Sequence, residues 1–117
     1  MQRYILEADD TLRLLRGENG EAEMIELWSG TRMLFFALSS VENVRLCRLT
    51  PVGADRQDAL SFTADDPLLG RRFALFVPKS HKDYGGFSKE LTQALRLTDL
   101  PEEEFVPHTC NQSGHHG

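Results

Sequence analysis

The feature that most constrains the fold is a pair of segments in which apolar residues occupy every second position. The first segment spans residues 59–64 and the second spans residues 72–77. Successive side chains of a β-strand point to opposite faces, so this period of two predicts two half-buried strands. Asp65–Gly70 forms a turn-rich run between them, and Pro78 ends the second, because proline cannot donate a ladder hydrogen bond. A chain containing two such strands is expected to build a sheet with one buried face.

Five further segments are expected to be strands, because each is a short apolar run bounded by turn residues. These segments are residues 4–8, a strand beginning at 12–14, and residues 22–28, 31–38 and 44–50. The apolar spacing in 22–28 fits a helix as well as a strand, but the preceding Asn19-Gly20 is typical of a tight hairpin turn and favours a strand. The run at 31–38 is expected to be a central strand buried on both faces.

One helix is expected after the strands, because Phe87, Leu91 and Leu95 recur on one helical face. Asp83 or Ser88 is expected to cap it, and a short helical turn is expected within residues 99–105. The order of elements predicts an α+β fold of about seven mostly antiparallel strands with one C-terminal helix. The strands would form a bent sheet or a small barrel. Residues 1–105 are interpreted as a single globular domain and residues 106–117 as a polar tail.

The composition is that of an ordinary folded domain. The chain has 117 residues, of which 40% are hydrophobic and 26% charged, which argues against wholesale disorder. It holds no run of 18 apolar residues, so no membrane association is expected. The first residues lack the pattern of a secretory signal, and a cytoplasmic location is expected. Cys47 and Cys110 form no disulfide framework, and Cys47 is expected to pack as a small hydrophobe.

The net charge of −5 excludes a generally basic nucleic-acid binder, so nucleic acid is an unlikely partner. The charge is unevenly distributed along the chain. Residues 1–30 carry three basic and seven acidic residues, whereas residues 31–90 carry nine basic and seven acidic ones. An anionic ligand therefore remains compatible with the middle of the chain. The acidic ends could steer a basic protein partner, or could simply keep the domain soluble.

A basic, glycine-containing segment leads into the expected helix and is the first candidate site. Helix N-termini carry unpaired N–H groups and partial positive charge, which suits phosphate or carboxylate. The spacing does not match a nucleotide-phosphate loop, and a flexible loop with solvated charges is the alternative interpretation. The candidate anion-binding residues are Arg71, Arg72, Lys79, His81, Lys82, Gly85, Gly86 and Lys89.

The tail is the second candidate site, because histidine and cysteine are ligands of zinc, copper and nickel. The candidate metal ligands are His108, Cys110, His115 and His116. Their spacing matches no structural zinc motif, and a disordered terminus is the alternative interpretation.

No catalytic motif is found in the sequence, so the chain is not expected to be an enzyme or to need a cofactor. Trp28, Phe35 and Phe36 are expected to belong to the core. The favoured hypothesis is a non-catalytic domain that binds a protein partner or a second copy of itself, as a bacterial or viral inhibitor, immunity protein or adaptor would. The alternatives are an anion- or phosphate-binding module, including one that takes a nucleic-acid backbone, and metal binding through the tail.

Overall fold

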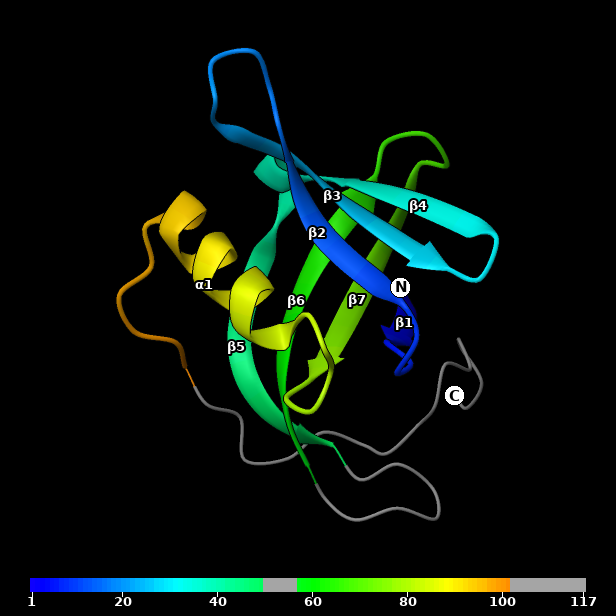
Figure 1. The fold of residues 1–117 in the computed structure, drawn as a ribbon, viewed down its shortest axis with the longest axis vertical. Helices are drawn as coiled ribbons and strands as arrows, with labels where there is room; N and C mark the ends of the chain where they lie inside the picture. Colours follow the sequence, from blue (N-terminus) through cyan, green and yellow to red (C-terminus); the bar gives the residue numbers. More distant parts are fainter. Residues whose placement is uncertain (50–56, 102–117) are drawn as a thin grey trace.

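The computed structural model describes residues 1–49 and 57–101. Within them lie seven strands, a 3-10 turn at Leu38–Ser40 and one α-helix, as Figure 1 shows. The elements are β1 (Gln2–Ile5), β2 (Thr11–Arg16), β3 (Ala22–Ser29), β4 (Arg32–Ala37), β5 (Glu42–Leu49), β6 (Gln57–Asp66), β7 (Arg71–Pro78) and α1 (Tyr84–Leu95). The expected α+β class is confirmed, with the helix on the C-terminal side of the strands.

The strands form two separate sheets. Sheet A has the order β1-β7-β6-β5, and sheet B has the order β2-β3-β4. The pairs β2–β3, β3–β4, β5–β6 and β6–β7 are antiparallel, whereas β1 pairs in parallel with β7. The prediction of mostly antiparallel strands is therefore confirmed. Neither sheet closes on itself, so the strands do not form a small barrel.

The main core lies between the two sheets. Leu60, Phe62 and Ala64 of β6 and Phe73, Leu75 and Val77 of β7 all face it, which confirms the period of two. The expectation that both strands are half-buried was wrong for β6, because its other face is buried as well. Leu12, Ile25, Leu27 and Phe36 of sheet B pack against them. The alternation thus explains why the two sheets stack, because each has one apolar face to bury.

Helix α1 covers the core beside β2 (Figure 1). Its buried residues are Phe87 and Leu91, and the ring of Phe87 stacks on Phe62 of β6 with centroids 5.9 Å apart. Asp83 is the N-cap residue, as one of the two expected positions, but its side chain makes no capping hydrogen bond. The helix is therefore held mainly by its apolar face.

Three strand predictions are corrected or decided by the structure. The prediction that 31–38 is a central strand was wrong, because β4 is an edge of sheet B with β3 as its one neighbour in that sheet. The first strand is Gln2–Ile5, earlier than the expected 4–8. The ambiguous segment is strand β3, which follows a turn where Gly20 has a φ of 83°. Only glycine adopts that conformation without strain, so the Asn-Gly signal was the correct guide.

Cys47 and Phe36 lie where the sequence placed them, whereas Trp28 and Phe35 do not, since Phe35 is half-buried on the face of sheet B that points away from the core. Cys47 and Phe36 are buried, as predicted. Trp28 is 39% exposed, so its assignment to the core was wrong. The reason is its register, because Trp28 pairs with Met33 on the face of sheet B that points away from the core.

Candidate functional site

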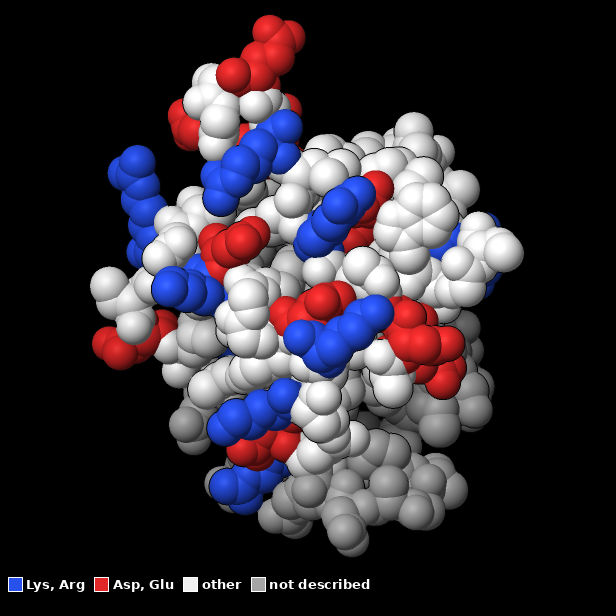
Figure 2. Space-filling model, viewed as in Figure 1, with Lys and Arg blue, Asp and Glu red and all other residues white. Residues whose placement is uncertain are grey.

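The outer face of sheet B, turned away from the core, gathers apolar side chains in contact with solvent. Alternation places six of them on this side of β2, β3 and β4, and none belongs to the core clusters. Trp28 and Met33 pair directly across β3 and β4 and are 39% and 41% exposed. Figure 2 shows uncharged side chains gathered over this region. The six residues, called the outer face below, are Leu15, Met24, Trp28, Met33, Phe35 and Ala37.

One ion pair stands among these apolar residues. Nε of Arg13 on β2 bonds to Oε1 of Glu26 on β3. The Glu26 side chain is only 8% exposed, whereas the Arg13 side chain is 63% exposed. The carboxylate is therefore neutralised beneath the surface, and the guanidinium is what the solvent meets.

A cavity of about 350 Å³ lies where the two sheets part, called the arginine pocket below. It is lined by β1 and β7 of sheet A and by the end of the β3–β4 hairpin of sheet B. The guanidinium-bearing residues are Arg3, Arg32 and Arg71, and the apolar ones are Leu34 and Phe73. No Asp or Glu among the described residues lines it.

Strand alternation explains why two of these arginines border a cavity between the sheets. Phe73 faces the core from β7, and Arg71 lies two positions earlier, on the same face of that strand. Leu34 packs against the core from β4, and Arg32 again lies two positions earlier. On each strand, the arginine thus lies on the core-facing side, at the position just before the first apolar residue of that side.

A hydrogen-bonded group closes one wall of the arginine pocket. The Tyr4 hydroxyl donates to Oδ2 of Asp10 over 2.6 Å, and the hydroxyls of Tyr4 and Ser29 lie 2.8 Å apart. Oδ2 of Asp10 also accepts the backbone N–H of Glu7. Burial, reinforced by the hydrogen bond to Asp10, raises the pKa of Tyr4 to about 12. The phenol is therefore neutral at physiological pH and brings no negative charge to the pocket.

The eight residues predicted to bind an anion fall into two groups. Arg71 and Arg72 begin β7, whereas Lys79 follows its last residue, Pro78. At about 3.3 Å per residue, the ends of this eight-residue strand lie roughly 23 Å apart. The second group is Lys79, His81, Lys82, Gly85, Gly86 and Lys89, which the structure places in the loop before α1 and in its first turns.

The polar groups of that loop are largely engaged with the rest of the fold. Oδ2 of Asp83 accepts the backbone N–H of Leu12 over 2.9 Å. Nζ of Lys82 donates to the hydroxyl of Thr11 over 3.3 Å. Nδ1 of the buried His81 accepts the N–H of Asp83 over 3.1 Å. The bonds to Leu12 and Thr11 fasten the start of α1 to β2, and the carboxylate of Asp83 adds negative charge where an anion was expected.

Arg72 has a structural setting that differs from that of Arg71. Its Nη1 donates to Asp65 over 2.7 Å, and its Nη2 donates to Glu42 over 2.6 Å and to the hydroxyl of Thr63 over 2.8 Å. This side chain therefore ties β7 to β6 and β5 across the opposite face of sheet A. Of the eight predicted residues, only Arg71 lines the arginine pocket.

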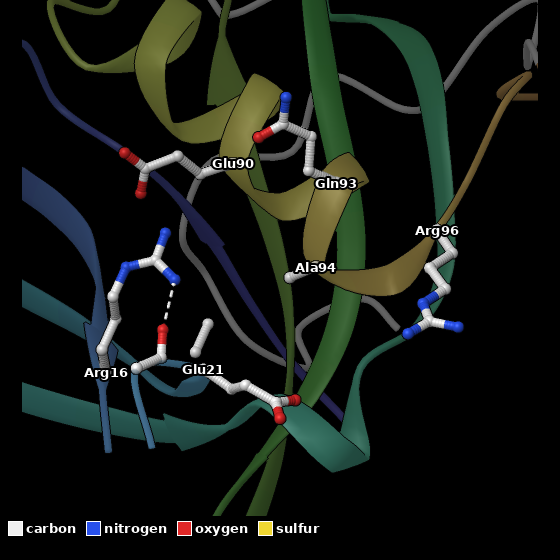
Figure 3. A pocket seen from close by; sticks show the side chains of 8 residues that line it. Arg16, Glu21, Glu90, Gln93, Ala94 and Arg96 are labelled. Carbon is white, nitrogen blue, oxygen red and sulfur yellow. Dashed lines mark hydrogen bonds between the residues drawn. The ribbon is translucent and has the colours of Figure 1, made fainter. Parts of the chain in front are cut away.

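A second cavity, of about 270 Å³, lies between α1 and the β2–β3 hairpin and is drawn in Figure 3. Nη1 of Arg16 donates to the carbonyl oxygen of Gly20 over 2.8 Å at its side. Glu21, Glu90 and Arg96 complete its charged lining. Figure 3 shows the guanidinium of Arg16 and the carboxylate of Glu90 facing one another. Its basic and acidic groups thus balance.

The remaining sequence candidates have simple outcomes. His108, Cys110, His115 and His116 lie outside the described residues. Across residues 1–49 and 57–101, no group of three or more His, Cys, Asp or Glu side chains is arranged to hold a metal. In the same ranges, no helix has the length and apolar character needed to cross a bilayer.

Sequence reasoning missed both the outer face and the arginine pocket. The pocket did leave a signal, because Arg32 and Arg71 each stand in phase with the apolar alternation that follows them. Reading the 31–38 run as buried on both faces concealed that phase in β4. No protein-family model, curated protein or solved structure matches the chain.

Proposed function

We propose that this chain is a non-catalytic protein-binding domain that docks its partner on the outer face of sheet B. The observation that carries the proposal is the exposed pair of Trp28 and Met33. Burying these side chains in an interface would remove apolar area from water, which stabilises a complex by about 25 cal/mol per Å² of that area before the costs of association. Contiguous exposed apolar patches on soluble domains mark sites of interaction.

The chemistry of the face favours a partner that presents apolar side chains beside a carboxylate. Arg13 stands within the apolar residues with an exposed guanidinium. The one carboxylate on this face of the sheet, that of Glu26, is already paired with Arg13. Tryptophan, methionine and arginine are enriched in interfaces, and tryptophan and arginine dominate binding energy. An inhibitor, immunity protein or adaptor would bind through such a face without doing chemistry.

The experiment uses the single tryptophan of the chain as a reporter. Wild type, a W28S/M33S variant and an L68S/L69S control are immobilised, and proteins from the cells that make the chain are captured. Leu68 and Leu69 suit the control because they are exposed apolar residues of the β6–β7 turn, outside sheet B. A captured protein is then purified and titrated against the chain labelled with 5-fluorotryptophan, whose spectrum has one ¹⁹F resonance.

The proposal expects a partner whose binding shifts that resonance and weakens at least tenfold in W28S/M33S but not in L68S/L69S. Circular dichroism should show that both variants fold, since the replaced side chains are exposed. A partner that binds W28S/M33S as tightly as wild type would contradict the proposal. So would a resonance that moves with chain concentration alone while light scattering shows a dimer, because the occupant would then be a second copy.

A further inference from the structure

Two of the arginines that line the arginine pocket, Arg32 and Arg71, have no carboxylate partner in the described part of the chain. Arg3 also borders the cavity, but its register beside Ala74 places its side chain on the opposite face of sheet A, and it interacts with other groups. Like charges on the border of one cavity repel each other. An anion placed among them would convert that repulsion into attraction.

Two arginines near those of the pocket, one in the sequence and one on the same sheet, are paired with carboxylates. Arg72, adjacent to Arg71 in the sequence, bonds to both Asp65 and Glu42. Arg13, on the same sheet as Arg32, bonds to Glu26. Each sheet thus has one arginine that is paired within the fold and another that borders the gap between the sheets. The charge of the pocket is therefore a local feature rather than a consequence of the overall composition, which is acidic.

The wall beyond the arginines does not supply a compensating anion. Asp10 is 2% exposed, and its Oδ2 accepts hydrogen bonds from the hydroxyl of Tyr4 and the N–H of Glu7. Tyr4, and not Asp10, reaches the cavity lining. The apolar floor is formed by Leu34 and Phe73, and Phe73 is fixed by an edge-to-face contact with Phe36 at 5.3 Å. A ligand here would meet basic residues together with the apolar side chains of Leu34 and Phe73.

We propose that the arginine pocket binds a phosphate monoester whose organic part is small and apolar or aromatic. A phosphate monoester carries a charge of about −1.5 to −2 at pH 7 and three acceptor oxygens, so it can bond to more than one guanidinium at once. A carboxylate has two oxygens and a single charge. Arginine forks fit phosphate in a bidentate manner. The cavity volume of about 350 Å³ falls in the range of small-ligand sites, which begins near 300 Å³.

This inference goes beyond the protein-binding role and does not depend on it. The phosphate monoester could come from a small metabolite or from a phosphorylated side chain of another protein, because both present the same chemistry. The probe for the first source is phenyl phosphate, and the probe for the second is a short peptide containing phosphotyrosine. Benzoate serves as the carboxylate of comparable shape.

The test is calorimetric titration of the full chain at low ionic strength with each probe. Phenyl phosphate is expected to bind at least tenfold more tightly than benzoate. Loss of one charge-assisted hydrogen bond should weaken it about tenfold or more in either R32Q or R71Q. R48Q is the matched control, because Arg48 is an exposed arginine on β5, at the edge of sheet A opposite β1, and it should leave the affinity unchanged.

The outcomes separate cleanly. Binding of the phosphopeptide with the same dependence on Arg32 and Arg71 would support the pocket and identify a protein as the source, whereas binding of phenyl phosphate alone would support a metabolite. Equal affinity for benzoate, or equal affinity in R32Q, R71Q and R48Q, would overturn the proposal. An absence of binding by every probe would overturn it as well. The fluorine resonance of Trp28 tests the outer face separately, so either proposal can fail alone.

Discussion

The two cavities of this domain differ little in size and greatly in charge. The cavity between α1 and the β2–β3 hairpin is lined by Arg16 and Arg96 together with Glu21 and Glu90, so its charges balance. The arginine pocket has Arg32 and Arg71 in its lining, and neither has a carboxylate partner among the described residues. A cavity lined by equal numbers of basic and acidic residues has no net charge for a ligand to neutralise. A cavity lined by an excess of basic residues attracts an anion. The volumes of the two cavities alone would not show this difference.

The cavities also differ in what lies beneath them. Phe73, at the floor of the arginine pocket, belongs to the main core, whereas Ala94 in the other cavity lies on an open face of α1. One cavity is therefore built on the rigid centre of the molecule and the other on its surface. Rigid support is what a binding site needs if it is to hold charged groups in a fixed geometry.

Substituting one lining residue of each cavity gives the largest expected difference in the free energy of unfolding. Phe73→Ala should lower the free energy of unfolding by about 3–5 kcal/mol, because it empties a buried ring position beside Phe36. Ala94→Ser should lower it by no more than about 0.5 kcal/mol, a cost set by helix propensity. Urea unfolding monitored by circular dichroism measures both. Similar losses of stability in the two variants would show that the arginine pocket is not built on the main core.

Removing the Tyr4 hydroxyl from the wall of the arginine pocket should give the next largest loss of stability. Tyr4→Phe should lower the free energy of unfolding by about 1–3 kcal/mol, because buried Asp10 loses the hydroxyl that donates to it. Tyr84→Phe is the matched control, since the Tyr84 hydroxyl makes no hydrogen bond with the described residues. It should change stability by less than about 0.5 kcal/mol. The account fails here if the two variants lose stability equally.

The same tyrosine predicts a dependence on alkaline pH. The pKa of Tyr4 is raised to about 12 in the folded chain, from 10.0, so folding favours the protonated phenol. Its contribution is therefore complete below pH 10 and is lost as the pH rises towards 12. Unfolding measured from pH 9 upwards should show a smaller fall in Tyr4→Phe than in wild type. Part of the fall should remain, because burial also raises the pKa of Tyr84, and an unchanged fall would contradict the assignment to Tyr4.

The smallest expected effect separates two adjacent residues of β7. Arg71→Gln should change the free energy of unfolding by less than about 0.5 kcal/mol, because Arg71 is exposed and has no carboxylate partner in the described residues. Arg72→Gln should lower it by about 1 kcal/mol, since it loses bonds to Asp65 and Glu42 that are partly exposed to solvent. Thermal unfolding of the two variants side by side measures the difference. A larger loss in Arg71→Gln would show that Arg71 supports the fold.

The sequence predicted the parts of the fold that depend on local pattern. Alternation identified β6 and β7, the Asn19-Gly20 turn decided β3, and the spacing of Phe87 and Leu91 located α1. It did not predict that the strands divide into two sheets, because pairing depends on which distant segments meet. The position of β4 at an edge follows from that pairing, and with it the exposure of Trp28 and Met33.

The candidate sites also depend on which distant segments meet, which the local sequence pattern does not predict. The expected anion site combined residues by sequence proximity and basic charge, and β7 then carried Arg71 about one strand length away from Lys79. Arg32 and Arg71 meet only because β4 and β7 lie on facing sheets, 39 positions apart in the chain. Their phase with the neighbouring apolar rows was visible in the sequence. The identity of the facing strand was not, so the cavity could be seen only in three dimensions.

The most direct test of the difference between the two cavities is a titration of the arginine Nε–Hε resonances with phenyl phosphate. The account predicts that the signals of Arg32 and Arg71 move together and saturate at one concentration, while those of Arg16 and Arg96 stay in place. Signals of Arg32 and Arg71 that do not move, or that move without saturation together with those of Arg16 and Arg96, would show that the arginine pocket has no specific affinity for phosphate.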